Sequence, residues 1–364
     1  MSRQIDQILY KALDLKDLST EEGMCIYENA ELSDLIFCAN ELRKKIQPNR
    51  IVTYIIDRNI NITNVCISRC KFCNFHCVPK DKKAYITKLD EYIQKIDELY
   101  KLGGKQILLQ GGLHPDLGLN YYKNLFKDLK SHYPDLKLHA LGPPEIAHIA
   151  KIERLTYKKV LIELTNSGLD SLPGAGAEIL NNRVRKEISP GKCTADVWLD
   201  VMHEAHKLNI VTSATMMFGH IETKNERIEH LFKIRDLQNL KPISSNGFIS
   251  FTSWPFQDSN TILNIKYNVH NTVIMQDYIR MIAISRIILN NIKNIQASWL
   301  TVGTQTGQIA LNAGANDFGS IMIEENVVSA AGANYSLNQK ELENNIIDSG
   351  YYPRQRNQLY EIVN

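Results

Sequence analysis

From residue 51 onward, short runs rich in β-branched and aromatic residues alternate with amphipathic helical stretches. Repeated strand–helix units of this kind build a parallel sheet whose crossovers are helices. About seven or eight units over roughly 280 residues favour a closed (β/α)8 barrel of the TIM type, in the α/β class, over an open sheet. The expected strands, of which the last is the weakest, are residues 52–57, 106–110, 136–141, 211–218, 248–253, 295–299 and 169–172.

The first part of the chain has a different pattern, and residues 1–50 are expected to form a helical N-terminal extension. Apolar side chains near the start recur on one helical face, and Ser19 with Glu22 has the spacing of a capping box. Pro48 then ends the helical pattern. Because no internal repeat or Pro/Gly-rich linker divides the rest of the sequence, residues 51–364 are expected to form one barrel domain.

Composition narrows the classes of partner. The formal net charge is only +2, which gives no electrostatic reason to expect nucleic acid as the main partner. A hydrophobic fraction of 44% excludes wholesale disorder. No apolar run approaches the ~18 residues that a membrane-spanning helix needs, and the first residues lack the basic-then-apolar pattern of a signal peptide. A cytoplasmic protein with no membrane partner is therefore expected.

Four of the seven cysteines fall within twelve residues, at Cys66, Cys70, Cys73 and Cys77. The first three have the spacing Cys-x3-Cys-x2-Cys and follow the first expected strand, which places them on the catalytic face of a (β/α) barrel. Three thiolates on one short loop can bind three irons of a cubic iron–sulfur cluster and leave the fourth iron open. A zinc site, with Cys77 or His76 as fourth ligand, and a closed iron–sulfur electron carrier are the alternatives.

The cysteine motif, with Phe72 directly before its third cysteine, resembles the signature of the radical S-adenosylmethionine (SAM) superfamily. The resemblance implies that Cys66, Cys70 and Cys73 hold a [4Fe-4S] cluster. It implies that SAM binds the open iron and is cleaved to a 5′-deoxyadenosyl radical, which removes a hydrogen atom from the substrate. It also implies a low-potential electron donor of the flavodoxin or ferredoxin type.

Further positions match the parts of that family which contact the cofactor. Gly111 and Gly112 follow the second expected strand, where the family places a Gly-rich segment against the amine of SAM. Met217 and Glu222 lie in a strand-ending segment that is similar to the family's segment near the adenine. Glu178, in a Gly-rich loop, is expected near the methionyl or ribose groups of SAM. A tight βα turn is the alternative reading of the two glycines.

Three longer segments resemble a subgroup of the superfamily that works on futalosine-type nucleosides and deazaflavin precursors. They are residues 168–190, 254–261 and 314–328. The first two are most similar to the cyclases of this subgroup, which act in the futalosine route to menaquinone. The resemblance implies a nucleoside-derived small-molecule substrate, with hydrogen abstraction from its sugar and closure onto an aryl ring. The adenosyl-transferring aminofutalosine synthases are the alternative.

Return of the aryl ring to aromaticity requires a base on the catalytic face. The candidates are Glu324, Glu325, His114 and His220, with Glu178 as a further one. Adjacent acids at the start of a helix also favour the helix dipole, which gives the two neighbouring glutamates a structural alternative. A lone histidine is more often a structural hydrogen-bonding residue than a catalyst.

Four residues are candidates for binding the substrate. Arg183 or Arg185 could pair with a carboxylate in a bidentate manner. Asn260 and Thr261 could hydrogen-bond to the sugar. A solvated basic helix is the alternative for the two arginines, and capping of a turn is the alternative for the other pair.

Overall fold

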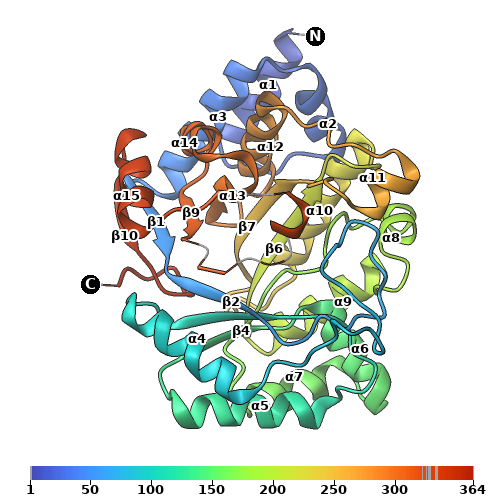
Figure 1. The fold of residues 1–364 in the computed structure, drawn as a ribbon. Coiled ribbons are helices and arrows are strands. Elements are labelled where there is room, and N and C mark those ends of the chain that lie inside the picture. Colours follow the sequence, from blue (N-terminus) through green and yellow to red (C-terminus); the bar gives the residue numbers. More distant parts are fainter. Residues whose placement is uncertain (1, 322, 325, 327–328, 333–334, 364) are drawn as a thin grey trace.

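The computed structural model of the chain describes residues 2–321, 323–324, 326, 329–332 and 335–363 (Figure 1). The described residues form ten strands: β1 (Ile51–Ile55), β2 (Asp57–Asn61), β3 (Gln106–Gln110), β4 (Lys137–Ala140), β5 (Ser171–Leu172), β6 (Val211–Phe218), β7 (Phe248–Pro255), β8 (Asn294–Gln296), β9 (Asp317–Ser320) and β10 (Tyr352–Gln355).

Helices connect these strands and cover the outside of the sheet (Figure 1). They are α1 (Ser2–Leu13), α2 (Thr20–Asn29), α3 (Leu32–Ile46), α4 (Leu89–Lys101), α5 (Leu119–His132), α6 (Pro143–Glu153), α7 (Tyr157–Thr165), α8 (Asn182–Ile188), α9 (Ala195–Lys207), α10 (Lys224–Asn239), α11 (Ile262–Tyr267), α12 (Met275–Ile288), α13 (Trp299–Val302), α14 (Thr304–Leu311), the 3-10 turn η1 (Ser329–Ala331) and α15 (Gln339–Asp348). Within this described part of the chain, no helix has the length and apolarity to cross a membrane.

The sheet is parallel throughout and closes on itself through its first segment. Its hydrogen-bonded order is β10-β1-β9-β8-β7-β6-β5-β4-β3-β2. β1 and β2 are consecutive stretches of one extended segment, separated only by Ile56. Because β1 pairs with β9 while β2 pairs with β3, this segment joins the two ends of the sheet. The predicted TIM-type barrel of the α/β class is therefore confirmed.

The N-terminal helices pack against one side of the barrel, mainly against α10 and α12 (Figure 1). The predicted capping box is present, because Ser19 Oγ accepts the N–H of Glu22 and the Glu22 carboxylate accepts the N–H of Ser19. Helix α3 ends at Ile46, just before Pro48. The helical character of this region is thus confirmed, while its treatment as a unit separate from residues 51–364 stays a prediction.

Most expected strands are present, but the first, expected at 52–57, forms two strands, β1 and β2, that extend to Asn61, and the one expected at 169–172 is reduced to Ser171–Leu172. β3 and β6 have the predicted bounds, whereas the strand expected at 295–299 ends at Gln296. β9 was not predicted, because it has four residues and its third, Gly319, has a φ of +74°. A short strand containing glycine lacks the β-branched run by which strands are recognised in a sequence.

Candidate functional site

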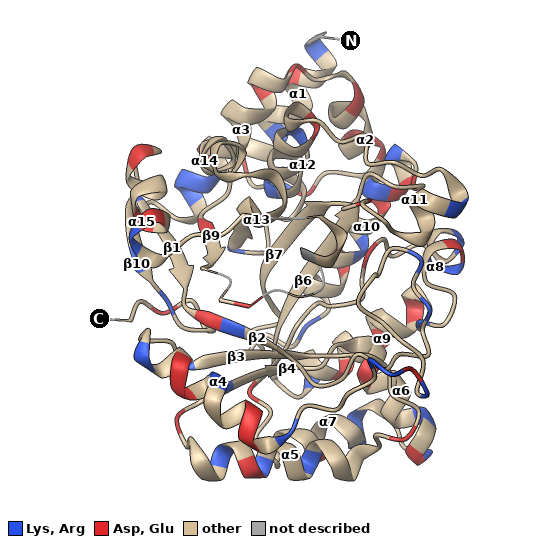
Figure 2. Cartoon of the chain, in the orientation of Figure 1, with Lys and Arg blue, Asp and Glu red and all other residues tan. Residues whose placement is uncertain are grey.

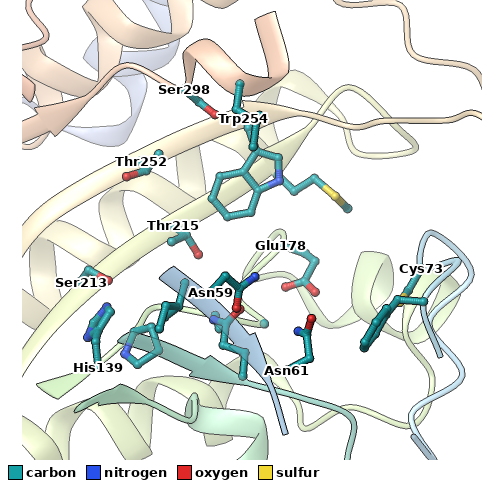
Figure 3. A pocket seen from close by; sticks show the side chains of 18 of the residues that line it. Asn59, Asn61, Cys73, His139, Glu178, Ser213, Thr215, Thr252, Trp254 and Ser298 are labelled. Carbon is teal, nitrogen blue, oxygen red and sulfur yellow. The ribbon is translucent and has the colours of Figure 1, made fainter. Parts of the chain in front are cut away.

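A cavity of about 430 Å³ runs through the interior of the barrel (Figure 3). Its lining includes Cys66, Cys70 and Cys73 from the loop after β2, and it includes Arg356 and Tyr360 from the C-terminal segment. In Figure 3, Cys73 and His139 lie at opposite ends of the view, with Glu178 and the polar side chains of the strands between them. The interiors of such barrels are normally filled by bulky branched side chains. This barrel is instead hollow and open to the cysteine loop.

The predicted cluster cysteines share this cavity, and all three are free thiols. Cys66 Sγ accepts hydrogen bonds from the backbone N–H groups of Ser68, at 3.4 Å, and Leu113, at 3.3 Å. Cys70 is buried, and burial raises the pKa of its thiol to about 12. Backbone N–H groups aimed at a sulfur atom are a common feature around iron–sulfur clusters. The donor set therefore fits an iron–sulfur cluster at this loop.

Two further features of the loop fit a bound group. The Ser68 hydroxyl is buried in the cavity lining and has no hydrogen-bond partner among the described residues. Gly112 leaves no room for a side chain, since a Cβ atom there would lie 2.1 Å from the carbonyl oxygen of Val65. Gly111 and Gly112 both line the cavity. The Gly-rich turn thus brings bare backbone against the cysteine loop.

The zinc alternative fits the structure poorly. Cys77 does not line the cavity, and its backbone pairs with Asn64 and Cys66 in the strand-like return of the loop. Among the described residues, no three His, Cys, Asp or Glu side chains are placed to bind one metal ion. A structural zinc site needs four ligands within about 2.3 Å of a single ion. The three thiols instead suit an iron–sulfur cluster, in which each thiol binds a different iron atom.

Glu178 lies in the cavity lining and forms a buried ion pair that the sequence did not indicate. Lys192 Nζ is 2.5 Å from Glu178 Oε1, and the two side chains are only 17% and 7% exposed. The same amine lies 5.3 Å from the centroid of the Phe72 ring, which also lines the cavity. Burial lowers the pKa of Lys192, but its interactions with Cys70 and Glu178 outweigh burial, so the net shift of the pKa is upward. The lysine therefore stays protonated beside the cysteine loop.

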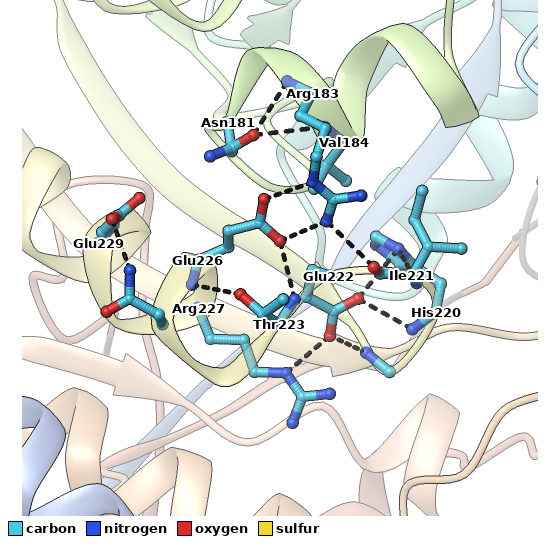
Figure 4. A network of polar contacts seen from close by, with 12 residues as sticks. Asn181, Arg183, Val184, His220, Ile221, Glu222, Thr223, Glu226, Arg227 and Glu229 are labelled. Atoms are coloured by element: carbon cyan, nitrogen blue, oxygen red, sulfur yellow. Dashed lines mark hydrogen bonds and ion pairs between the residues drawn. The ribbon is translucent and has the colours of Figure 1, made fainter.

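Met217 and Glu222 have different places. Met217 lines the cavity at the end of β6. Glu222 lies outside the lining and accepts hydrogen bonds from the backbone N–H groups of Gly219 and His220 and from Arg227 Nε (Figure 4). Burial raises the pKa of Glu222, but His220, Arg227 and the Gly219 N–H together lower it to about 2. This carboxylate holds the turn after β6 in shape.

The two candidate histidines are occupied by hydrogen bonds within their own loops. His220 Nε2 lies 3.1 Å from the Met217 carbonyl oxygen, and its Nδ1 accepts the N–H of Ile221. His114 Nδ1 accepts the N–H of Asp116. Burial lowers the pKa of His114. Neither histidine lines the cavity.

Glu324 lies in an ion-pair network between β2 and α4. It contacts Lys95 at 2.5 Å and Arg58 at 2.9 Å, and Arg58 also pairs with Glu98. Glu324 is not part of the cavity lining. Glu325 lies outside the described residues.

The two candidate arginines are engaged in structural contacts. Arg183 forms a bidentate pair with Glu226 at the start of α10, with Nε–Oε1 and Nη2–Oε2 distances of 2.8 and 2.5 Å (Figure 4). Arg185 is buried and donates to the carbonyl oxygens of Gly176, Ala177 and Cys193. Neither lines the cavity, and Arg185 instead stabilises the loop that carries Glu178.

Asn260 and Thr261 lie in the turn before α11. Thr261 Oγ1 accepts the N–H of Asn264 and so caps that helix. Asn260 has a φ of +60°, a left-handed conformation that asparagine tolerates. Neither residue lines the cavity. Their placement matches the turn-capping alternative.

The interior of the barrel contributes polar residues that sequence reasoning did not single out. β6 and β7 pair in register so that Ser213 faces Ser250 and Thr215 faces Thr252, and all four line the cavity. Further lining side chains on other strands are Asn59, Asn61, Gln106, Gln110 and Gln296, and Trp254 of β7, from the segment 254–261 that the sequence did indicate, lines the cavity as well. Small hydroxyl residues at alternate positions of two strands were the available signal, since alternate residues share one face of a strand.

Two buried groups of the lining have shifted acid–base properties. Burial raises the pKa of Glu145, at the start of α6, to about 7. Burial and the nearby Arg356 lower the pKa of His139 to about 3. His139 Nδ1 lies 2.7 Å from Ser171 Oγ and 3.3 Å from Gln358 Nε2. His139 is therefore a neutral hydrogen-bonding group, whereas Glu145 is poised to exchange a proton near neutrality.

A hollow (β/α)8 barrel with three cysteines on its first loop defines a class of enzyme, and comparison with known proteins identifies the same class. Residues 60–234 match the family model of the radical SAM superfamily. The chain belongs to this superfamily and is an enzyme. The superfamily implies a [4Fe-4S] cluster and SAM as cofactors. Residues 245–364 match the model of the CofH/MqnC C-terminal region, which confirms the predicted subgroup.

Curated relatives match the chain over nearly its whole length. It is 42% identical to a cyclic dehypoxanthine futalosine synthase of Streptomyces coelicolor, with 98% of this chain and 88% of the relative covered. It is 39% identical to a synthase of the same name from Halalkalibacterium halodurans, with 99% and 95% covered. It is also 38% identical to a 5-amino-6-(D-ribitylamino)uracil–L-tyrosine 4-hydroxyphenyl transferase of Methanococcoides burtonii, with 95% and 96% covered.

Solved structures share the fold at low sequence identity. A methylornithine synthase has a TM-score of 0.69 and 17% identity, with 96% of this chain and 98% of that chain covered. The hydrogenase maturase HydG of Carboxydothermus hydrogenoformans has a TM-score of 0.72 and 14% identity, with 99% and 81% covered. These similarities establish the barrel architecture.

Proposed function

We propose that the enzyme converts dehypoxanthine futalosine to cyclic dehypoxanthine futalosine, in the futalosine route to menaquinone. The observation that carries this proposal is identity of 42% and 39%, over almost the full chain, to two synthases of that name. The hollow interior supports it, because a hydroxyl- and amide-lined cavity suits a substrate that combines a sugar with an aryl ring.

Cys66, Cys70 and Cys73 would hold the [4Fe-4S] cluster at the end of the cavity formed by the first loop. The bound cluster and SAM together supply a 5′-deoxyadenosyl radical, which is able to break an unactivated C–H bond of the sugar. The loop contributes backbone N–H groups to Cys66, and Lys192 provides a buried positive charge beside Cys70. Both features stabilise negative charge on the thiolate ligands.

The residues beside the cysteine loop would bind SAM. Glu178 and Lys192 present opposite charges side by side, which matches the amine and carboxylate of a methionyl group. Gly111 and Gly112 offer backbone without side chains, and Met217 adds an apolar surface for the adenosyl group. Glu222 would act indirectly, because it fixes the turn that follows Met217.

The substrate would occupy the barrel interior, with its sugar toward the cysteine loop. Thr215 and Thr252 offer hydroxyl groups from adjacent strands, and Trp254 offers an aromatic surface to the aryl ring (Figure 3). Enclosure by the barrel excludes water, so a reactive radical meets only the substrate. The protein thus orients the substrate and excludes water, while the cofactors supply the reactive radical.

Closure of the new ring on the aryl group requires loss of one proton and one electron from that group. The electron would return to the cluster held by Cys66, Cys70 and Cys73, which gives up one electron when SAM is cleaved, so the conversion as a whole is redox-neutral. Glu145 would accept the proton, since it lines the cavity and its pKa of about 7 is near neutrality. We assign this role to Glu145 rather than to Glu324, His114 or His220, because those three side chains lie outside the lining. We assign structural roles to Arg183, Arg185, Asn260 and Thr261, since none of the four lines the cavity.

An anaerobic assay tests the function directly. Reconstituted enzyme with SAM, dehypoxanthine futalosine and a low-potential electron donor should give free 5′-deoxyadenosine and a cyclised product in equal amounts. If the cluster assembles and SAM binds, yet this substrate stays unchanged, the cyclase proposal fails. Labelled adenosyl carbons in the product would instead identify an aminofutalosine synthase.

A second candidate function has its own support. Several archaeal relatives named as 4-hydroxyphenyl transferases are 36–38% identical over most of the chain. The matching experiment supplies L-tyrosine with 5-amino-6-(D-ribitylamino)uracil in place of the futalosine. Formation of a coupled product, with no cyclisation of dehypoxanthine futalosine, would transfer the assignment to that reaction.

A further inference from the structure

The loop that carries the cysteines is the most basic part of the chain. Residues 66–88, termed here the outer loop, contain Arg69, Lys71, Lys80, Lys82, Lys83 and Lys88 against one acidic residue, Asp81. The outer loop thus has a net charge of +5, whereas the whole chain has +2, so the remainder is net negative. Figure 2 shows the blue positions gathered on this loop, near α6 and α8. The charge is local to the cysteines.

Most of these cations are not used within the fold. Arg69, Lys80, Lys82 and Lys83 are exposed, and in the described part of the chain their side chains form no ion pair or hydrogen bond. Lys71 differs, because its amine lies 4.0 Å from a carboxylate oxygen of Glu187 and 4.2 Å from an aromatic centroid. Unpaired cations that repel one another within one short loop favour an external anionic partner.

The outer loop folds back so that its basic residues stay beside the cysteines. The N–H of Cys77 donates to the Asn64 carbonyl oxygen at 2.9 Å, and the N–H of Cys66 donates to that of Cys77 at 3.0 Å. The Asn64 side chain also donates to the Lys83 carbonyl oxygen at 2.8 Å. These bonds hold Cys77 against Cys66 and Lys83 against Asn64, two residues before the first cysteine.

Apolar side chains are exposed between these cations. Ile67 and Val78 are 43% and 51% exposed, and Tyr85 and Ile86 are also exposed. Ile67 lies next to Cys66, and Val78 lies next to Cys77, whose backbone pairs with that of Cys66. A small apolar centre with a charged surround is typical of transient protein interfaces, and electron-transfer complexes are at the small end of that range.

We propose that the outer loop is the docking surface for the enzyme's electron donor, an acidic protein of the flavodoxin type. The donor would transfer one electron to the cluster, and no atom would pass between the two proteins. The cavity side of the cysteine loop faces SAM and substrate under the proposed function, so the outer side is the face left for a protein. The inference rests on the radical chemistry of that function and is independent of which substrate the enzyme takes.

Charge complementarity gives the surface its expected behaviour. Long-range attraction accelerates encounter between an acidic donor and the basic loop, and it weakens as salt shortens the Debye length. Affinity for the donor should therefore fall steeply with ionic strength. Reduction by a small chemical reductant does not depend on a docking surface, so it should be insensitive to changes in the loop.

The test compares two triple variants of equal charge change. The first carries Lys80→Glu, Lys82→Glu and Lys83→Glu on the outer loop. The control carries Lys127→Glu, Lys293→Glu and Lys340→Glu, three exposed positions on α5, before β8 and on α15. Binding of oxidised flavodoxin to the reconstituted enzyme is measured by calorimetry at low and high salt. The outer-loop variant should lose roughly tenfold or more in affinity, and the control should stay within about twofold.

A second measurement separates docking from chemistry. The rate of 5′-deoxyadenosine formation should fall in the outer-loop variant when reduced flavodoxin is the donor, and should be unchanged with dithionite. Equal loss of flavodoxin binding in both triple variants, or none in the first, would overturn the proposal. Binding of a short DNA duplex as tightly as flavodoxin would also overturn it, since the loop would then be a general polyanion site. If the enzyme does not convert dehypoxanthine futalosine but the outer-loop variant still loses flavodoxin binding, the cyclase proposal fails and the docking proposal stands.

Discussion

The two ends of the cavity are built in different ways. At the cysteine end, Cys66, Cys70, Phe72 and Cys73 come from one loop of eight residues. Deeper in the barrel, the lining is assembled from side chains of β1, β2, β3, β4, β6, β7, β8 and β9 and from the C-terminal segment. One end is a continuous motif, and the other exists only when distant strands are in register.

This difference separates two kinds of information. A loop of fixed spacing can hold the same cofactor in many enzymes, because its geometry depends little on the rest of the chain. The dispersed interior can change one strand at a time, so it is suited to set the substrate. Relatives that are 36–42% identical but differ in their named reactions are consistent with this division. Changes at the cysteine end should therefore affect the cluster and SAM, and changes in the interior should affect the substrate.

The largest effect is expected at the cysteine end. Replacement Cys70→Ser should abolish cluster assembly and lower product formation by at least about 10³-fold, because a hard hydroxyl replaces one of three thiolate ligands. Iron content and visible absorbance of reconstituted protein check this directly. Cys77→Ala is the matched control and should keep both, since Cys77 lies outside the cavity lining. Loss of the cluster in that control instead would indicate a fourth protein ligand.

The same division explains what could be predicted from the sequence. The barrel followed from strand–helix alternation, and the candidate cluster residues followed from the local spacing of Cys66, Cys70 and Cys73, whereas Gly111 and Gly112 were expected from the family resemblance. Lys192 was missed because its partner Glu178 is fourteen residues away, and the two meet only when a loop folds back. His139 was missed because its significance depends on Gln358, more than two hundred residues later.

The residues that the sequence suggested as substrate ligands lie outside the cavity, where they cap helices or form internal ion pairs. Thr261 has the sequence features of a sugar ligand and of a helix cap, and a single chain offers no way to weigh the two. Arg183 could pair with an external carboxylate or an internal one, and the internal Glu226 is adjacent only in the fold. Whether such a side chain binds the substrate or an internal partner depends on residues distant in the sequence, and the local spacing of residues does not show which residues those are.

The second prediction removes the buried cation beside the cysteines. Lys192→Met leaves Glu178 as an uncompensated buried charge, which should cost about 3–5 kcal/mol of unfolding free energy and weaken SAM binding. Denaturant unfolding and SAM titration measure the two effects. Lys207→Met breaks a surface pair with Glu204 and should change neither. Unchanged SAM affinity in the first variant would separate Lys192 from the cofactor site.

The third prediction uses pH to locate the base. If Glu145 accepts the ring proton, kcat should fall as pH drops through about 7, because the protonated carboxyl has no capacity for a further proton. Glu145→Gln should lower kcat by about 10²-fold and remove this limb of the pH profile, while 5′-deoxyadenosine still forms. An unaltered profile in the variant would assign the limb to another group.

The same shift predicts a change in stability of definite sign. Because burial raises the pKa of Glu145 in the folded protein, the folded state binds the proton more tightly than the unfolded state does. The unfolding free energy should therefore decrease as pH rises from the ordinary glutamate pKa through about 7. Glu145→Gln should flatten this slope in urea denaturation curves, and a variant with the wild-type slope would contradict the assignment.

The smallest effect is expected deep in the barrel. Thr252→Val keeps the shape of the side chain but removes one hydroxyl from the cavity lining, so KM for the nucleoside should rise by about tenfold. SAM affinity should not change, because Thr252 is remote in sequence and position from the cysteine loop (Figure 3). Ser253→Ala is the control, since the next residue of a strand points to the opposite face. Equal KM values for both variants would show that the interior hydroxyls do not select the substrate, and the contrast between the two ends of the cavity would lose its basis.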